Sequence, residues 1–164
     1  VQFVYENGLM NGVTTTSFGP NVTTSRAMLA TILYRLEGEP SVGSSDFTDV
    51  EIGMYYTEAV TWASSKGIVT GYGDGTFLPN KAISREEMAA MLYRYASYKG
   101  YDVTNMKDLS GYSDAASVSS YAVEALQWAT GAGLITDMGD GTLTPGGPAV
   151  RAQIATILMR FLGE

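Results

Sequence analysis

The sequence predicts an all-α fold, in which three helix–loop–helix repeats pack as a pseudo-threefold bundle with short extended loop segments. A short motif that begins with glycine occurs three times, and an arginine follows each copy at one fixed offset. An amphipathic stretch begins at each arginine. Because a single two-helix unit cannot bury its own apolar face, the three units are expected to share one core. The motif copies are Gly8-Leu-Met-Asn-Gly12, Gly67-Ile-Val-Thr-Gly71 and Gly133-Leu-Ile-Thr-Asp137, and the arginines are Arg26, Arg85 and Arg151.

The second helix of each repeat is predicted to begin at this arginine. In repeat two, Ser84 and Glu87 have the spacing of a capping box, in which each side chain bonds the backbone amide of the other residue. Apolar residues then recur at i, i+3, i+4 and i+7, which places them on one face of a helix. They are Met88, Met91, Leu92 and Tyr95 in repeat two, Leu29, Ile32, Leu33 and Leu36 in repeat one, and Ile154, Ile157, Leu158 and Phe161 in repeat three.

The first helix is predicted just before the glycine motif, from a run that starts at Tyr55 in repeat two and at Tyr121 in repeat three. Gly67 and Gly133 fall where a left-handed helix C-cap is expected, since glycine adopts that conformation without strain. The loop that follows in repeat two is expected to contain a short extended piece at 76–78. Each repeat is therefore read as helix, glycine turn, loop and helix.

Composition restricts the function. The 164 residues include 17 acidic and 10 basic residues, for a net charge of −7, and neither cysteine nor histidine. The negative charge disfavours binding to nucleic acid and to anionic membrane surfaces. Without cysteine and histidine, the usual thiol nucleophile, general base and transition-metal ligands are missing, so we expect no cofactor and no metal. We also expect the chain, which does not open with a signal peptide, to be a fragment of a longer protein.

These residues resemble the S-layer homology (SLH) repeat. The fullest match is in repeat two, at Phe47-Thr-Asp-Val50, Trp62-Ala63, Gly71-Tyr-Gly-Asp-Gly-Thr-Phe77 and Ile83-Ser-Arg-Glu-Glu87. Repeat three matches more loosely, and repeat one matches from Phe3 onward, without the start of a repeat. The resemblance divides the chain into repeats 1–40, 41–100 and 101–164, which together form one SLH domain.

The resemblance implies a non-covalent anchor that binds secondary cell-wall polysaccharide, often pyruvylated, and attaches a larger secreted or S-layer protein to the bacterial surface. It implies an extracellular location in the cell wall or S-layer and no enzymatic activity. Two alternatives stay open, a protein–protein interaction module at the cell surface and peptidoglycan binding. A second copy of the chain could also supply the missing start of repeat one, which would give self-association.

The arginines that open the second helices are the expected ligand contacts. A guanidinium offers a carboxylate a planar pair of donors, and in the first helical turn it lies beside free amides and the positive end of the helix dipole. In the family, the serine or threonine before this arginine belongs to the binding signature. The expected ligand-binding residues are Arg85, Ser84, Gly71, Tyr72 and Gly73 in repeat two, Arg26, Ser25 and Gly12 in repeat one, and in addition Asp49 and Arg151.

The three sites are expected to differ in strength. Repeat three has Val150 where the other repeats have serine, and Asp137 where they have glycine. The missing hydroxyl and the added negative charge both oppose an anionic ligand. We therefore expect Arg85 and Arg26 to carry binding and Arg151 to contribute little.

Other recurring residues have structural readings. Arg35, Arg94 and Arg160 follow the first set of arginines at one fixed offset and are assigned to helix C-termini, where a cation is favoured. Trp62 and Trp128 are expected in the core. Tyr72, in a glycine loop, is the better candidate for contact with a sugar.

Two further function classes have weaker support. The segments Gly73-Asp-Gly-Thr76 and Gly139-Asp-Gly-Thr142 are similar to the ends of calcium loops, but each supplies only one carboxylate where several ligands are needed. A glycan-cleaving enzyme would need paired carboxylates, and the recurring acids Glu58 and Glu124 have no partner at a recurring spacing. A protein-interaction domain is the stronger rival to the anchor.

Overall fold

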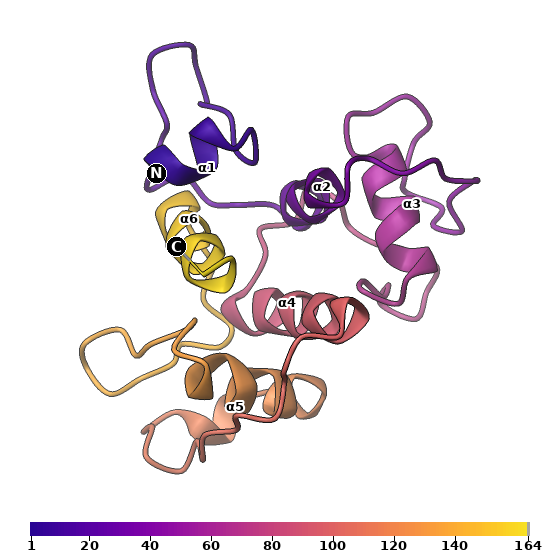
Figure 1. Ribbon diagram of the computed structural model, residues 1–164. Helices are drawn as coiled ribbons and strands as arrows, with labels where there is room; N and C mark the ends of the chain where they lie inside the picture. The colour runs from indigo at the N-terminus through magenta and orange to yellow at the C-terminus, as the bar shows by residue number, and fades with distance from the viewer. Residues whose placement is uncertain (164) are drawn as a thin grey trace.

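The computed structural model describes residues 1–163, so Glu164, the last residue of the predicted third repeat, lies outside the described residues. Within residues 1–163 the fold is all-α, as predicted, with six α-helices, two short 3₁₀ helices and no strand (Figure 1). The α-helices are α1 (Gln2–Glu6), α2 (Arg26–Leu36), α3 (Thr57–Ser65), α4 (Arg85–Lys99), α5 (Val123–Gly131) and α6 (Arg151–Phe161), and the 3₁₀ helices are η1 (Ala115–Ser117) and η2 (Ser120–Ala122).

The helices form a closed ring. The second helices α2, α4 and α6 surround the centre of the molecule, and the first helices α1, α3 and α5 lie outside them (Figure 1). Each first helix packs on the second helix of the preceding repeat: α3 on α2, α5 on α4, and α1 on α6. The last of these pairs joins the two ends of the chain, so the pseudo-threefold bundle is closed.

Backbone hydrogen bonds connect the repeats where the second helices begin. The first amides of a helix have no partner inside the helix. Here they donate to carbonyls of the following repeat, and the segments just before the helices form isolated antiparallel bridges. The donor and acceptor pairs are Arg26 to Lys81 at 3.0 Å, Arg85 to Gly147 at 2.9 Å and Arg151 to Val22 at 2.9 Å.

The predicted capping box is confirmed in repeat two. The Glu87 amide donates to Ser84 Oγ at 3.1 Å, and the Ser84 amide donates to Glu87 Oε2 at 2.9 Å. In repeat three only the second half can form, because valine has no acceptor, and the Val150 amide donates to Gln153 Oε1 at 3.1 Å. The predicted apolar stripe of α4 is buried, with every member no more than 2% exposed.

The glycine turns and the tryptophans also lie as expected. Gly67 and Gly133 have φ values of 68° and 69°, the left-handed conformation that ends the first helices. Trp62 and Trp128 are 2% and 3% exposed and belong to the core. Burial of two such large side chains contributes several kcal/mol, on the order of 2–3 each.

Two local predictions are wrong. Tyr55 lies before α3, and Tyr121 lies in η2, so neither is part of the first α-helix. Both side chains are more than half exposed, and each lines a groove formed with the preceding repeat. The predicted extended piece at 76–78 does not hold at its last residue, since Leu78 has the left-handed φ of 56°. In residues 1–163 no helix has the length and apolar character needed to cross a membrane.

Candidate functional site

The three arginines that open the second helices, Arg26, Arg85 and Arg151, are here called the signature arginines. All three are buried, at 5–7% exposure, and each reaches into the glycine loop of the following repeat. There Nε and Nη2 donate to two backbone carbonyls. The acceptors are Phe77 and Thr70 for Arg26, at 2.9 and 3.0 Å, Leu143 and Thr136 for Arg85, at 2.7 and 2.9 Å, and Phe18, at 2.8 Å, and Asn11 for Arg151.

This exchange between repeats overturns the predicted grouping of the site. Arg85 was expected beside Gly71 and Tyr72 of its own repeat, but it contacts the loop of repeat three. Arg26 of repeat one is the arginine that lies with Gly71 and Tyr72. Burial of this side chain lowers the pKa of the Arg85 guanidinium.

The hydroxyls of Ser84 and Ser25 and the carboxylate of Asp49 were predicted to contact the ligand. In the structure they accept hydrogen bonds from backbone amides of the domain. Ser84 Oγ and Ser25 Oγ accept the amides three residues ahead, the latter from Met28 at 3.2 Å, and so cap α4 and α2. The Asp49 carboxylate accepts the amides of Phe77 and Leu78, at 2.8 Å each. These groups shape the frame of the site.

The glycines are required by the loops themselves. A Cβ on Gly71 would lie 2.5 Å from the Thr76 carbonyl oxygen and 2.7 Å from the Phe47 ring, so the loop and a packed aromatic side chain already fill that space. A Cβ on Gly12 would likewise meet backbone carbonyls of its own loop. Gly73 has φ 86° and forms the turn of the loop. Gly71 and Gly12 nevertheless line two grooves, so their place as ligand contacts stays a prediction.

Two equivalent grooves lie where three repeats meet. We call them groove I, with a volume of about 340 Å³, and groove II, with about 310 Å³. Each combines a glycine loop, one face of a second helix, a signature arginine from the preceding repeat in the ring and a tyrosine from the following repeat. Groove I is lined by Leu9, Met10, Asn11, Gly12, Met28, Thr31, Ile32, Arg35, Tyr55 and Arg151, and groove II by Arg26, Val69, Thr70, Gly71, Tyr72, Glu87, Ala90, Met91, Arg94 and Tyr121.

One carboxylate organises groove II. Glu87 Oε1 accepts hydrogen bonds from Lys81 Nζ at 3.0 Å, from Arg26 Nη1 at 3.2 Å and from the Tyr72 hydroxyl. Burial works against the ionised form of Glu87, but hydrogen bonds from the Ser84 amide, Tyr72 and Lys81 outweigh it and lower the pKa of the carboxyl. Each nitrogen of the Arg26 guanidinium thus donates one hydrogen bond: Nε to the Phe77 carbonyl, Nη2 to the Thr70 carbonyl and Nη1 to Glu87.

The remaining cation of groove II is Arg94. Among residues 1–163 its guanidinium has no hydrogen-bond or ion-pair partner, although it is partly buried in the groove lining with Arg26 and Tyr121. Burial lowers its pKa, and the charge of Arg26 lowers it further. The predicted position at a helix C-terminus is wrong, because α4 continues beyond it to Lys99.

The counterparts of Arg94 in the other repeats do have partners. Arg160 Nη1 donates to the Gly133 carbonyl at 3.1 Å, which supports the predicted structural role at a helix end. Arg35, in groove I, makes only a 3.4 Å contact with the Leu9 carbonyl and a 3.9 Å contact with the Glu39 carboxylate. Sequence reasoning missed Arg94 as a groove residue because the groove around it forms only when three repeats pack together.

The comparisons with known proteins agree with this architecture. The S-layer homology domain matches residues 1–28, 46–89 and 111–155, well over half of the chain. The chain belongs to the S-layer homology family. The three matched segments fall in the three SLH repeats, and the first lacks its beginning, as predicted. Membership in this family places the chain at the bacterial cell surface.

Relatives carry the SLH region within much longer proteins. An endoglucanase of Bacillus sp. (strain KSM-635) is 31% identical over 99% of this chain, which spans 17% of the relative. The surface-layer 125 kDa protein of Lysinibacillus sphaericus is 29% identical over 99% of the chain and 14% of its own length. Exoglucanase XynX of Acetivibrio thermocellus is 30% identical over 99% of the chain and 15% of its own length. The relatives named as enzymes thus match through a small, shared SLH part.

Proposed function

We propose that this SLH domain is a non-covalent anchor, which binds an anionic secondary cell-wall polysaccharide in grooves I and II. It would thereby hold a larger secreted or S-layer protein on the bacterial surface. A carboxylate-bearing sugar, such as a pyruvylated one, is the ligand class that suits the grooves. The proposal rests on the family, on the printed names of the surface-layer relatives and on the charges of groove II.

The unpaired guanidinium of Arg94 is the observation that carries this proposal. In a chain of net charge −7, Arg26 and Lys81 pair with Glu87, the one carboxylate of the groove II lining, and Arg94 adds a further positive charge to that lining. Holding Arg94 partly buried beside Arg26 is unfavourable in the free protein. A bound carboxylate would supply the missing counter-charge and two parallel hydrogen bonds.

Groove I supports the same function with a different residue set. Its cations are Arg151 and Arg35, and Met28 occupies the place that Glu87 has in groove II, so no carboxylate lines it. Nη1 of Arg151 has no partner among residues 1–163, whereas Nη1 of Arg26 bonds Glu87. The proposal therefore gives Arg151 a larger part than the sequence predicted.

The third interface is the poorest candidate. There Arg85 lies with Asp137 and Met138, which replace Gly71 and Tyr72. Among residues 1–163 the Asp137 carboxylate accepts only the Gly139 amide, at 2.8 Å, and it is exposed. A fixed negative charge beside the loop would repel an anionic ligand. Two sites on one polymer chain would still bind tightly, because the second contact benefits from effective concentration.

The test is a pull-down on purified bacterial sacculi, before and after removal of their non-peptidoglycan polymers. The wild type is compared with Arg35→Gln/Arg94→Gln, which neutralises one cation in each groove, and with Lys66→Gln/Lys107→Gln, which removes two charges elsewhere on the surface. Since a charge-assisted hydrogen bond contributes about 1.5–3 kcal/mol, the groove variant should bind at least roughly tenfold more weakly.

Each outcome is decisive for one reading. Binding that is lost with the polymer and with the groove arginines, but not with the two lysines, supports the polysaccharide anchor. Binding to bare peptidoglycan would replace the ligand with another glycan. Binding to neither material would favour a protein partner at the cell surface.

A further inference from the structure

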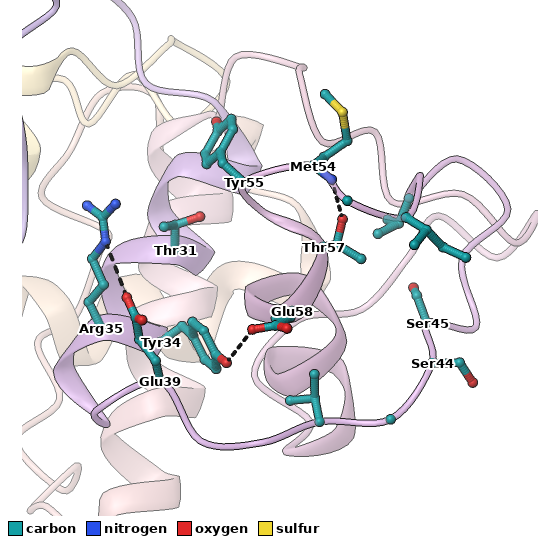
Figure 2. A pocket seen from close by; sticks show the side chains of 15 residues that line it. Thr31, Tyr34, Arg35, Glu39, Ser44, Ser45, Met54, Tyr55, Thr57 and Glu58 are labelled. Atoms are coloured by element: carbon teal, nitrogen blue, oxygen red, sulfur yellow. Dashed lines mark hydrogen bonds and ion pairs between the residues drawn. The ribbon is translucent and has the colours of Figure 1, made fainter.

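A second hollow lies beside groove I. It has a volume of about 920 Å³ and is enclosed by α2, the linker that follows it and the loop before α3 (Figure 2). We call it the outer groove. Thr31, Arg35 and Tyr55 line both the outer groove and groove I, so the two form one continuous path across Tyr55.

Tyr55 is a fixed aromatic surface at the junction. Its side chain is 59% exposed, yet its ring packs edge-on against the buried Tyr56 with 5.1 Å between ring centroids. A held, exposed aromatic ring with a polar tip suits the apolar C–H face and the hydroxyls of a sugar. Because its orientation is set by Tyr56, little conformational entropy is lost when a ligand packs on it.

The outer groove differs from groove I in its charge. The Tyr34 hydroxyl, in the lower half of Figure 2, donates to Glu58 Oε2 at 3.2 Å. Glu39 faces Arg35 at 3.9 Å. With two carboxylates and one arginine, the lining opposes an anion and offers acceptors to sugar hydroxyls. Its chemistry therefore suits an uncharged hexose or N-acetylhexosamine.

At the corresponding place, between α4 and the loop before α5, a side chain bonds the loop to the helix. Glu86 of α4 accepts hydrogen bonds from the Ser119 amide at 2.9 Å and the Ser119 hydroxyl at 2.8 Å, and from Tyr121 at 3.4 Å. These bonds hold the loop before α5 against α4. In α2 the counterpart of Glu86 is the buried Ala27, which cannot make them. The loop before α3 is thus not tied to α2 by such a carboxylate, and the outer groove lies between them.

We infer that the outer groove binds the uncharged sugar unit that adjoins the acidic unit held in groove I, with the polysaccharide chain crossing Tyr55. This inference rests on the proposed anchoring function. Groove I would then grip at least two consecutive sugars, whereas groove II would grip the acidic unit alone. The difference gives the domain one selective site and one general site for the same polymer.

The test uses the carboxylated monosaccharide and the disaccharide that contains it, both released from purified wall polysaccharide by partial hydrolysis. Calorimetry is done in an Arg94→Gln background, which weakens groove II. Gly43→Trp fills the outer groove, because a Cβ at Gly43 meets nothing within 4 Å and its backbone is not left-handed. Gly111→Trp, at a similarly open position outside both grooves, is the matched control.

The disaccharide should bind roughly tenfold more tightly than the monosaccharide, as one or two added hydrogen bonds would give. Gly43→Trp should abolish that gain and leave monosaccharide binding unchanged, while Gly111→Trp should retain the gain. Monosaccharide binding with no gain for the disaccharide, or a gain that survives Gly43→Trp, overturns the outer groove and leaves the anchoring function intact. Failure of both sugars to bind would overturn both proposals.

Discussion

Grooves I and II share one frame and differ at a decisive position, the third residue of the second helix. In groove II this residue is Glu87, which joins Arg26, Lys81 and Tyr72 in one cluster. In groove I it is Met28, whose sulfur only meets the Ser25 amide at 3.5 Å. The same capping position thus joins an ion-pair cluster in groove II, whereas in groove I it places no carboxylate in the lining beside Arg151. The counterparts of Lys81 and Tyr72 in repeat one are Val22 and Val13, so the whole cluster around Glu87 is particular to groove II.

The largest effect is expected from removing the signature arginines. Arg26→Gln and Arg151→Gln each break two buried hydrogen bonds to carbonyls, which should lower the free energy of unfolding by about 3 kcal/mol. Arg26→Gln should cost roughly 1 kcal/mol more, because it also leaves buried Glu87 without one cation. Chemical denaturation measures both. Losses below about 1 kcal/mol would contradict the bridging role of these arginines.

Replacing Met28 with glutamate, the residue at the same position in groove II, should lower the affinity of groove I for an anionic sugar. Met28→Glu places a carboxylate beside Arg151 and should weaken binding of a carboxylated sugar in groove I by roughly fivefold, through repulsion of a like charge. Met28→Gln, of similar size and uncharged, is the control and should change affinity little. Equal affinities for the two variants, measured by calorimetry in the Arg94→Gln background, would show that this charge does not decide binding.

The acid sensitivity of the two grooves should also differ. The pKa of Glu87 is lowered in the folded protein, so its stabilising contribution is present above the ordinary value of 4.5 and is lost as pH falls below it. Glu87→Gln should therefore flatten the fall in melting temperature between about pH 5 and pH 3, an effect of a few degrees. Met28→Gln should leave that slope as it is in the wild type. An unchanged slope in Glu87→Gln would contradict the role of the cluster.

Sequence reasoning succeeded where the cause is local. Ser84 and Glu87 cap a helix from three residues apart, and Gly67 ends one by its own backbone conformation. It failed for Arg85, whose acceptors lie in the next repeat, more than 50 residues away along the chain. A repeat read alone places its arginine beside its own loop, whereas the closed ring places it beside the neighbour's.

The same reason explains why Arg94 was misread. In sequence it stands level with Arg35 and Arg160, and only the longer α4 places it inside a helix and away from any terminus. Tyr121, which faces it, comes from the following repeat. A groove built from three repeats has no contiguous signal, so its residues can be found in the sequence only after the ring is known.

The signature arginines join each repeat to the next, and the proposed function makes Arg94 the contact of the ligand. The most direct measurement is unfolding free energy and polysaccharide affinity, in parallel, for Arg94→Gln and Arg85→Gln. Arg94→Gln should keep its stability within about 1 kcal/mol and lose roughly tenfold in affinity. Arg85→Gln should lose about 3 kcal/mol of stability and, while folded, keep its affinity within roughly twofold, since its contacts lie outside grooves I and II. Full affinity in Arg94→Gln, or lost affinity in folded Arg85→Gln, would contradict these two roles.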